Sequence, residues 1–192
     1  MLEIRPANRL FVALDLPDAP RRALAEVAVR LAADLGGRAV PAANIHVTLA
    51  FIGRAPEEAG PPLAGALRAA CAPPQRPLRL RVGAVVPRPV RRSARLVAAE
   101  VHDEGGGLSD LAGRLTAGLA RALGRPAPPG ASWPHVTLVR FRRPVRAGAD
   151  MSSDHERPFD VSRATLYDSH QIPGRPPRYE PLLSVVLGDP MP

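Results

Sequence analysis

The stretches 44-NIHVTLAFIG-53 and 133-WPHVTLVRF-141 share the tetrapeptide HVTL, at 46–49 and 135–138. Each copy lies in a run of apolar and β-branched residues typical of a strand, and each follows a segment with a helical apolar period. Two of the five histidines in the chain occupy the same place in these runs. A duplicated lobe explains this arrangement.

Strand alternation places the histidine and threonine of each copy on one face, because side chains at i and i+2 point the same way. His46 is then next to Thr48, and His135 is next to Thr137. If a pseudo-two-fold axis brings the two faces together, two imidazoles and two hydroxyls surround one site. One imidazole can take a proton from water, the other can protonate a leaving oxygen, and the hydroxyls can hold phosphate oxygens. The competing interpretation is two unrelated core histidines.

Composition indicates one soluble globular unit of 192 residues, 45% of them hydrophobic. The first twenty residues carry charges and lack the pattern of a signal peptide, and no run is apolar enough to span a bilayer. A single cysteine, Cys71, rules out an internal disulfide and is interpreted as a core residue. We therefore expect a cytoplasmic protein without a membrane partner.

The formal net charge of +8 comes from 26 arginines, with no lysine, set against 18 acidic residues. This excess favours an anionic partner, either a nucleic acid or a phosphorylated small molecule. Charge alone does not separate the two.

Periodicity and turn residues predict a mixed order of helices and strands without a long polar linker. Helices are expected over 18–35, with Asp18 as N-cap, over about 56–71, and over 105–124. Strands are expected over 9–17, 46–52, 78–86, 94–102, 135–141, 158–170 and 178–188.

The two H-x-T motifs, "RLFVALDLP" near the start and "LYDSHQIPGRPPRYEPL" near the end resemble the 2H phosphoesterase superfamily. Within it, the sequence is similar, nearly end to end, to the bacterial and archaeal RNA 2′,3′-cyclic phosphodiesterases, also called 2′-5′ RNA ligases. The resemblance implies an α+β, bilobal fold in which two pseudo-symmetric antiparallel sheets, flanked by helices, surround a central cleft. Residues 1–192 would form this one domain, with lobes centred on 44–53 and 133–141.

The resemblance also implies hydrolysis of 2′,3′-cyclic phosphate ends to 2′-phosphates without metal or cofactor. His46 and His135 match the catalytic histidines, and Thr48 and Thr137 match the phosphate-holding threonines. Phe11 matches an aromatic position that packs against the base, and Arg140 matches the arginine after the second motif. We favour His46 as the acid and His135 as the base, and the near-symmetry leaves the reverse assignment open.

Arg140 poses a difficulty, because strict alternation from His135 puts it on the opposite face. Either the strand bulges or ends before Arg140, or its side chain is only a solvated charge. Tyr179 is either a site residue or a packed strand tyrosine, and His170 would alter substrate preference if it faced the site. His102 and His155 are interpreted as surface histidines. Two further groups are interpreted as basic rims, namely Arg142, Arg143 and Arg146, and Arg88, Arg91, Arg92 and Arg95.

The expected substrates are RNA ends with a 2′,3′-cyclic phosphate, including tRNA fragments, or cyclic nucleotides, bound by a monomer. The same groups could join RNA ends through a 2′-5′ linkage. A non-catalytic nucleotide or RNA binding module is the alternative, although binding alone needs no matched acid and base. A two-histidine metal site is disfavoured, since neither motif carries a carboxylate at ligand spacing.

Overall fold

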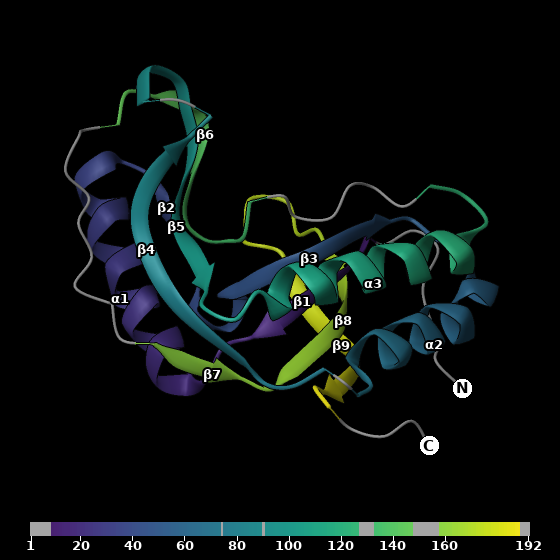
Figure 1. Ribbon diagram of the computed structural model, residues 1–192. Coiled ribbons are helices and arrows are strands. Elements are labelled where there is room, and N and C mark those ends of the chain that lie inside the picture. The colour runs from purple at the N-terminus through teal and green to yellow at the C-terminus, as the bar shows by residue number, and fades with distance from the viewer. Residues whose placement is uncertain (1–8, 74, 90, 127–132, 148–157, 189–192) are drawn as a thin grey trace.

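The computed structural model describes residues 9–73, 75–89, 91–126, 133–147 and 158–188 (Figure 1). Its helices are α1 (Asp18–Leu35), α2 (Gly60–Cys71) and α3 (Gly107–Leu123). Its strands are β1 (Arg9–Asp15), β2 (Arg38–Ala39), β3 (His46–Gly53), β4 (Leu78–Arg88), β5 (Ala94–Asp103), β6 (His135–Val145), β7 (Phe159–Val161), β8 (Arg163–His170) and β9 (Arg178–Val186). No helix within these described residues is long and apolar enough to cross a membrane.

The predicted helices and strands are present, except that the strand expected over 158–170 is interrupted at Ser162 and forms β7, paired with β4, and β8, paired with β1. The starts of α1 and α2 also differ from prediction. Asp18 is the first residue of α1 and not its N-cap, because the extended Pro17 holds that position, and the Asp18 carboxylate accepts a hydrogen bond from Arg21. The second helix begins at Gly60, since Glu57–Ala59 forms a separate 3-10 turn.

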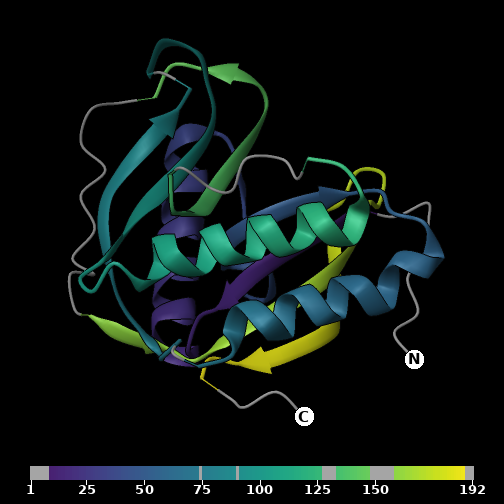
Figure 2. The ribbon, with the colours of Figure 1, turned by 45° about the vertical axis from the view of Figure 1, so that its right-hand side comes forward.

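The strands form one antiparallel sheet in the order β7-β4-β5-β6-β3-β1-β8-β9, with β2 paired to β6. The predicted α+β fold is confirmed, and the two antiparallel sheets that were expected are joined into one because β3 pairs with β6. One half holds β3, β1, β8 and β9, and the other holds β6, β5, β4 and β7. The motif strands β3 and β6 meet at the centre, where the single pair Val47 and Val136 joins the halves (Figures 1 and 2).

Helices α1 and α3 each cover the half of the sheet whose strands they do not follow in the chain, whereas α2 stays with the half that contains β3. Helix α1 follows β1 yet packs on β6, burying Leu24, Val27 and Ala28. Helix α3 follows β5 yet packs on β3, and α2 packs on α3, β8 and β9 (Figure 2). Burial of these apolar faces closes one continuous core.

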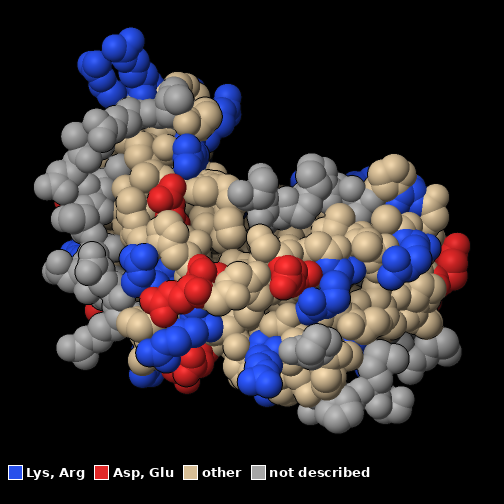
Figure 3. All heavy atoms as spheres, in the orientation of Figure 1, with Lys and Arg blue, Asp and Glu red and all other residues tan. Residues whose placement is uncertain are grey.

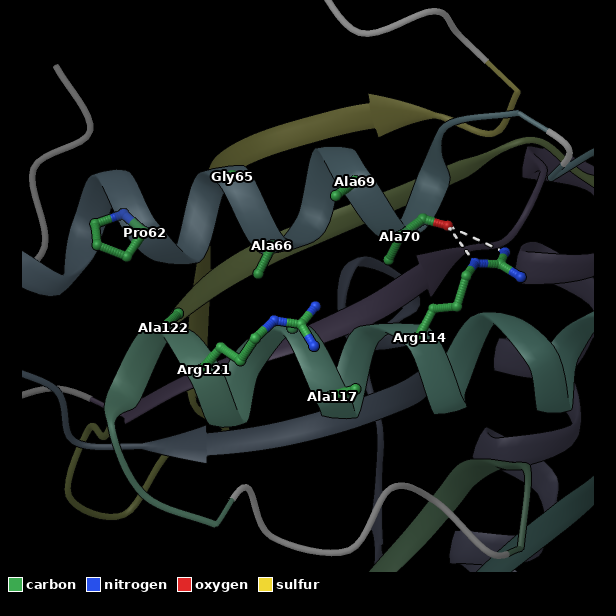
Figure 4. A pocket seen from close by; sticks show the side chains of 10 residues that line it. Pro62, Gly65, Ala66, Ala69, Ala70, Arg114, Ala117, Arg121 and Ala122 are labelled. Carbon is green, nitrogen blue, oxygen red and sulfur yellow. Dashed lines mark hydrogen bonds between the residues drawn. The ribbon is translucent and has the colours of Figure 1, made fainter.

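Helices α2 and α3 approach closely because small residues line their contact. A Cβ added at Gly118 would lie 3.2 Å from Ala66 Cβ. Figure 4 shows Ala66 pointing from α2 toward α3, and Arg114 of α3 reaching back to α2. The Arg114 Nη2 and Nε groups donate to the carbonyl oxygen of Ala70, at 3.1 and 3.3 Å. This bond satisfies a carbonyl in the last turn of α2.

Both motif strands carry a β-bulge at the same place, immediately after the threonine. On β3, Thr48 and Ala50 pair with consecutive residues of β1, which makes Leu49 the extra residue. On β6, Thr137 and Val139 pair with consecutive residues of β5, which makes Leu138 the extra residue. The Leu138 carbonyl is taken by the Val40 amide at 2.8 Å. Because a bulge shifts the side-chain alternation by one, the residues beyond it change face.

At Gly37, the chain before β2 approaches the outer part of β6 closely, and a substitution there tests this contact. A Cβ there would overlap the Val139 side chain and lie 2.7 Å from a ring carbon of Phe141. We expect Gly37→Ala to lower the free energy of unfolding by about 1–3 kcal/mol, through overpacking. Urea denaturation measures it.

Gly113→Ala is the matched control, because a Cβ at that helical position meets no atom within 4 Å. It should raise stability by roughly 0.4–1 kcal/mol, since alanine loses less entropy than glycine in a helix. Equal effects of the two substitutions would contradict the approach at Gly37.

Candidate active site

The sheet junction brings the two H-x-T motifs side by side on one face. Val47 and Val136 pair directly and point to the core, so their neighbours point to the other face. The antiparallel register places His46 beside Thr137 and Thr48 beside His135. We call the sheet face that carries these four side chains the site face.

The His46 imidazole is held at both nitrogens. Its Nδ1–H donates to the carbonyl of Asn44 at 2.8 Å, in the 3-10 turn before β3. That bond leaves Nε2 as the acceptor, and the Thr48 hydroxyl donates to it at 3.1 Å. The Asn44 amide itself donates to the carbonyl of Pro177 at 2.7 Å, which fixes the turn against the chain before β9.

Burial, together with the nearby Arg140 and His135, lowers the pKa of His46 to about 4 against the opposing bond to Asn44. Its ring is therefore neutral at neutral pH in the free protein. The influence of His135 on His46 reflects the proximity of the two imidazoles.

His135 repeats the backbone bond and adds a stacked indole. Its Nδ1–H donates to the carbonyl of Trp133 at 2.8 Å, again two residues upstream. The Trp133 ring lies parallel to the imidazole at 4.1 Å between centroids and 18° between planes. Burial, followed by the positive charges of Arg140 and Arg88, lowers the pKa of His135, and the bond to Trp133 opposes that shift.

Trp133 is itself fixed from two sides. Its indole N–H donates to Glu100 Oε1 at 3.1 Å, and the Arg88 guanidinium lies over its ring at 4.1 Å. Arg88 also lies 3.4 Å from the same carboxylate oxygen. Because Glu100 pairs with His135 across β5 and β6, this cluster braces one catalytic candidate directly.

An aromatic row runs across the first half of the site face. Phe51, Phe11 and Tyr167 are paired in register on β3, β1 and β8. Phe11 stacks with Tyr167 at 5.2 Å, and the edge of Tyr179 meets Phe11 at 4.9 Å and His46 at 5.4 Å. Tyr179 therefore faces the site. Phe11 is 4% exposed at the centre of the row, whereas Phe51 is 62% exposed.

The row is anchored by a partly buried acid. Asp15 accepts hydrogen bonds from the Tyr167 hydroxyl at 2.7 Å and from the Thr165 hydroxyl at 2.6 Å. Burial and the Asp15 carboxylate raise the pKa of Tyr167, so this hydroxyl stays a donor.

Arg140 lies on the site face, because the bulge at Leu138 restores it to the side of His135. Its charge acts on both imidazoles and on Tyr179. Phe51 is the equivalent residue of β3, placed by the bulge at Leu49. The same backbone device thus presents an arginine from one half and a phenylalanine from the other.

The remaining candidate side chains are not at the site. His170 points away from the site face and lies 3.1 Å from Glu180 and 3.5 Å from Asp168. His102 is exposed, as expected, and packs over Gly83. Cys71 is buried, and burial raises the pKa of its thiol to about 11. His155 lies outside the described residues.

Three neighbours of the histidines were not predicted as site residues, namely Phe51, Trp133 and Glu100. The doublets Leu49-Ala50 and Leu138-Val139 are the signal that could have found Phe51, since two consecutive core residues break strand alternation. Among the described residues, no three His, Cys, Asp or Glu side chains are grouped so that they could hold a metal ion.

Comparison with known proteins gives one concordant result. A family model described as LigT like Phosphoesterase matches residues 14–95, which include the first H-x-T motif. The RNA 2′,3′-cyclic phosphodiesterase of Thermus thermophilus is 34% identical over 142 residues, which are 71% of this chain and 70% of that protein.

Solved structures agree over nearly the whole chain. The crystal structure of TT0787 of Thermus thermophilus has a TM-score of 0.78 at 28% identity and covers 94% of this chain and 99% of its own. E. coli LigT complexed with 3′-AMP has a TM-score of 0.73 at 29% identity and covers 95% and 99%.

The lowered pKa of His46 predicts a dependence of stability on pH. Between pH about 6.5 and about 4, His46 takes up a proton in the unfolded chain but not in the folded protein. Unfolding therefore takes up protons in this window, and this contribution to stability is lost as pH falls, by up to about 1.4 kcal/mol per pH unit.

Urea denaturation at pH 7 and pH 4.5 should show a larger loss for the natural protein than for His46→Gln, which lacks the titrating ring. The other acidic and basic groups contribute alike to both proteins and drop out of the difference. An equal loss in the two proteins would show that His46 titrates normally.

Proposed function

Since the chain belongs to the LigT-like phosphoesterases, as the sequence predicted, we propose that it hydrolyses 2′,3′-cyclic phosphate ends of RNA to 2′-phosphates with His46 and His135. The observation that supports this proposal most directly is the pair of neighbouring imidazoles. Each is held at Nδ1 by a carbonyl two residues upstream. This arrangement turns both Nε2 atoms away from the backbone carbonyls, and they can exchange protons with one substrate once the Thr48 hydroxyl turns from His46 Nε2 to the phosphate.

The reaction needs one neutral and one protonated imidazole. The neutral ring takes a proton from water as the water oxygen attacks phosphorus, the bond from phosphorus to O3′ breaks, and the protonated ring gives its proton to O3′. A bound phosphate supplies the negative charge that favours imidazolium on one of the two rings. Both rings are neutral before substrate arrives, so the substrate itself sets the required state.

Thr48 and Thr137 are placed to donate to the non-bridging oxygens, which gain charge in the transition state. Arg140 adds a fixed positive charge beside both rings. These groups belong to the protein and need no metal in the proposed reaction. The reverse direction would join a 2′-5′ linkage with the same groups.

The aromatic half of the site face suits the terminal base. We assign this contact to Phe51, because 62% of its surface is exposed, and we assign Phe11 to the packing behind it, because it is 4% exposed. Stacking on an aromatic ring accepts any base.

The direct test is turnover of a short RNA ending in a 2′,3′-cyclic phosphate, with EDTA present. We expect a 2′-phosphate product, and His46→Ala and His135→Ala should each reduce kcat by at least about 100-fold, the contribution of one positioned acid or base. Thermal melting of each variant shows whether it is folded. Retained turnover in both folded variants would reject the mechanism.

An RNA that binds without turnover would identify a binding module instead. In that case the affinity of the natural protein for the cyclic end would be measurable while no product formed over a long incubation. That outcome would reject the proposed hydrolase function.

Trp133 stacks on His135, and its replacement should therefore lower kcat. Trp133→Leu removes the stacked ring and the bond to Glu100 but keeps the backbone carbonyl that holds Nδ1. We expect kcat to fall by about 10- to 100-fold with little change in KM, because the proton-transfer geometry is lost and not the binding groups.

Trp133→Phe is its matched control. It keeps a stacked ring and loses only the indole bond, so its kcat should lie between those of the natural protein and Trp133→Leu. A kcat for Trp133→Leu equal to that of the natural protein would show that the stack does not position His135.

A further inference from the structure

The excess positive charge of the chain is confined to two segments. Residues 86–97 and 138–147 hold eight arginines and no acidic residue. The other 18 basic residues of the 26 are balanced by the 18 acidic residues in the rest of the chain. The formal charge of +8 is therefore a local property and not a general one.

The sheet places these two segments together. They form the adjoining ends of β4 and β5 and the outer part of β6, which are neighbours in the strand order. Figure 3 shows basic side chains gathered where that end of the sheet projects in Figure 1. We call this region the arginine end; its described side chains are Arg88, Arg92, Arg95, Arg140, Arg142, Arg143 and Arg146.

The arginine end begins at the candidate active site. Arg88 and Arg140 both pair with Leu96 in register, so the three side chains form one row on the site face. Arg88 covers Trp133, which covers His135. The eleven residues of β6 then extend outward for about 33 Å at the usual strand rise of about 3.3 Å per residue. A chain leaving the histidines in this direction passes several arginines.

Most of this charge has no acidic partner among the residues that the structure describes. Of the described arginines at this end, only Arg88 forms an ion pair, with Glu100. The described residues of the two segments include none of the exposed large apolar side chains, which are Val29, Phe51, Ile172 and Val186. A protein partner needs an apolar or aromatic centre to its interface, whereas a nucleic acid backbone needs only cations. The surface composition therefore favours a phosphodiester chain.

We propose that the arginine end binds the phosphodiester backbone of the RNA whose cyclic phosphate lies at His46 and His135. The preferred substrate is then an RNA chain and not a mononucleotide. This inference rests on the proposed hydrolase function. Arginine suits the role because its planar guanidinium matches phosphate with two parallel hydrogen bonds.

The test compares two substrates, cytidine 2′,3′-cyclic monophosphate and a ten-nucleotide RNA ending in the same cyclic group. Arg92→Gln, Arg142→Gln and Arg143→Gln are combined in one variant, which spares Arg88 and Arg140 beside the histidines. The control variant combines Arg22→Gln, Arg30→Gln and Arg163→Gln, three exposed arginines elsewhere with the same total charge change.

We expect the arginine-end variant to lose about tenfold or more in kcat/KM on the RNA, through KM, and to stay within about twofold on the mononucleotide. The control variant should stay within about twofold on both. The dependence of log kcat/KM on log salt for the RNA should flatten by roughly 0.7 for each phosphate contact removed.

Equal loss in the two variants, or equal loss on the two substrates, would overturn the proposal. Failure of the proposed function gives a different result, namely no turnover of either substrate by the natural protein. In that case, fluorescence anisotropy still measures the affinity of the arginine end for a ten-nucleotide RNA that ends in a 3′-hydroxyl. Weaker binding by the arginine-end variant than by the control supports it, and equal binding overturns it.

Discussion

Side-chain alternation along a strand is the constraint on which the site depends. In a regular β3 or β6, only the second and fourth residues after the histidine would lie on the face of that histidine. The fifth residue would point into the core. The bulges at Leu49 and Leu138 insert one residue and exchange the faces. His, Thr and the fifth residue can then share one surface, while Leu49 and Leu138 stay in the core. The bulged backbone thus places three site residues on one face and keeps the leucine in the core, which strict alternation would not allow.

The two halves use the same backbone and carry opposite chemistry. Phe51 and Arg140 occupy equivalent positions, and each begins a row that crosses its half of the sheet. One row is aromatic and anchored by Asp15, and the other carries guanidinium groups beside a braced Trp133. An RNA end has the same division, with bases that stack and phosphates that carry charge. Pseudo-symmetry supplies the paired histidines, and its breaking would give the proposed RNA substrate one direction across the site.

Local pattern was enough to predict the strands, the helices, the family and the face shared by His46 and Thr48. It left the direction of Arg140 open, although the apolar doublet Leu138-Val139 is the local signal of the bulge that sets this direction. Trp133 and Glu100 were missed for a different reason: they meet only when β5 lies beside β6, and they are 33 residues apart in the chain. The His170 question was likewise settled by β9, whose Glu180 lies beside it. The periodicity of a sequence does not show which distant segments come into contact. It does show where strand alternation breaks, as in the doublets Leu49-Ala50 and Leu138-Val139.

The exchange of helices between the halves bears on how such a molecule can arise and fold. A chain consisting of β1, α1, β2 and β3 alone would leave its sheet bare and its helix without a surface to cover. Two such chains could satisfy each other only by trading helices, in the manner of a domain-swapped dimer. The present chain has that interlocked architecture within one polypeptide, with β8 and β9 returning to complete the first half. Neither half is then an autonomous folding unit, and a cut between α2 and β4 would yield fragments that regain structure only by complementing each other.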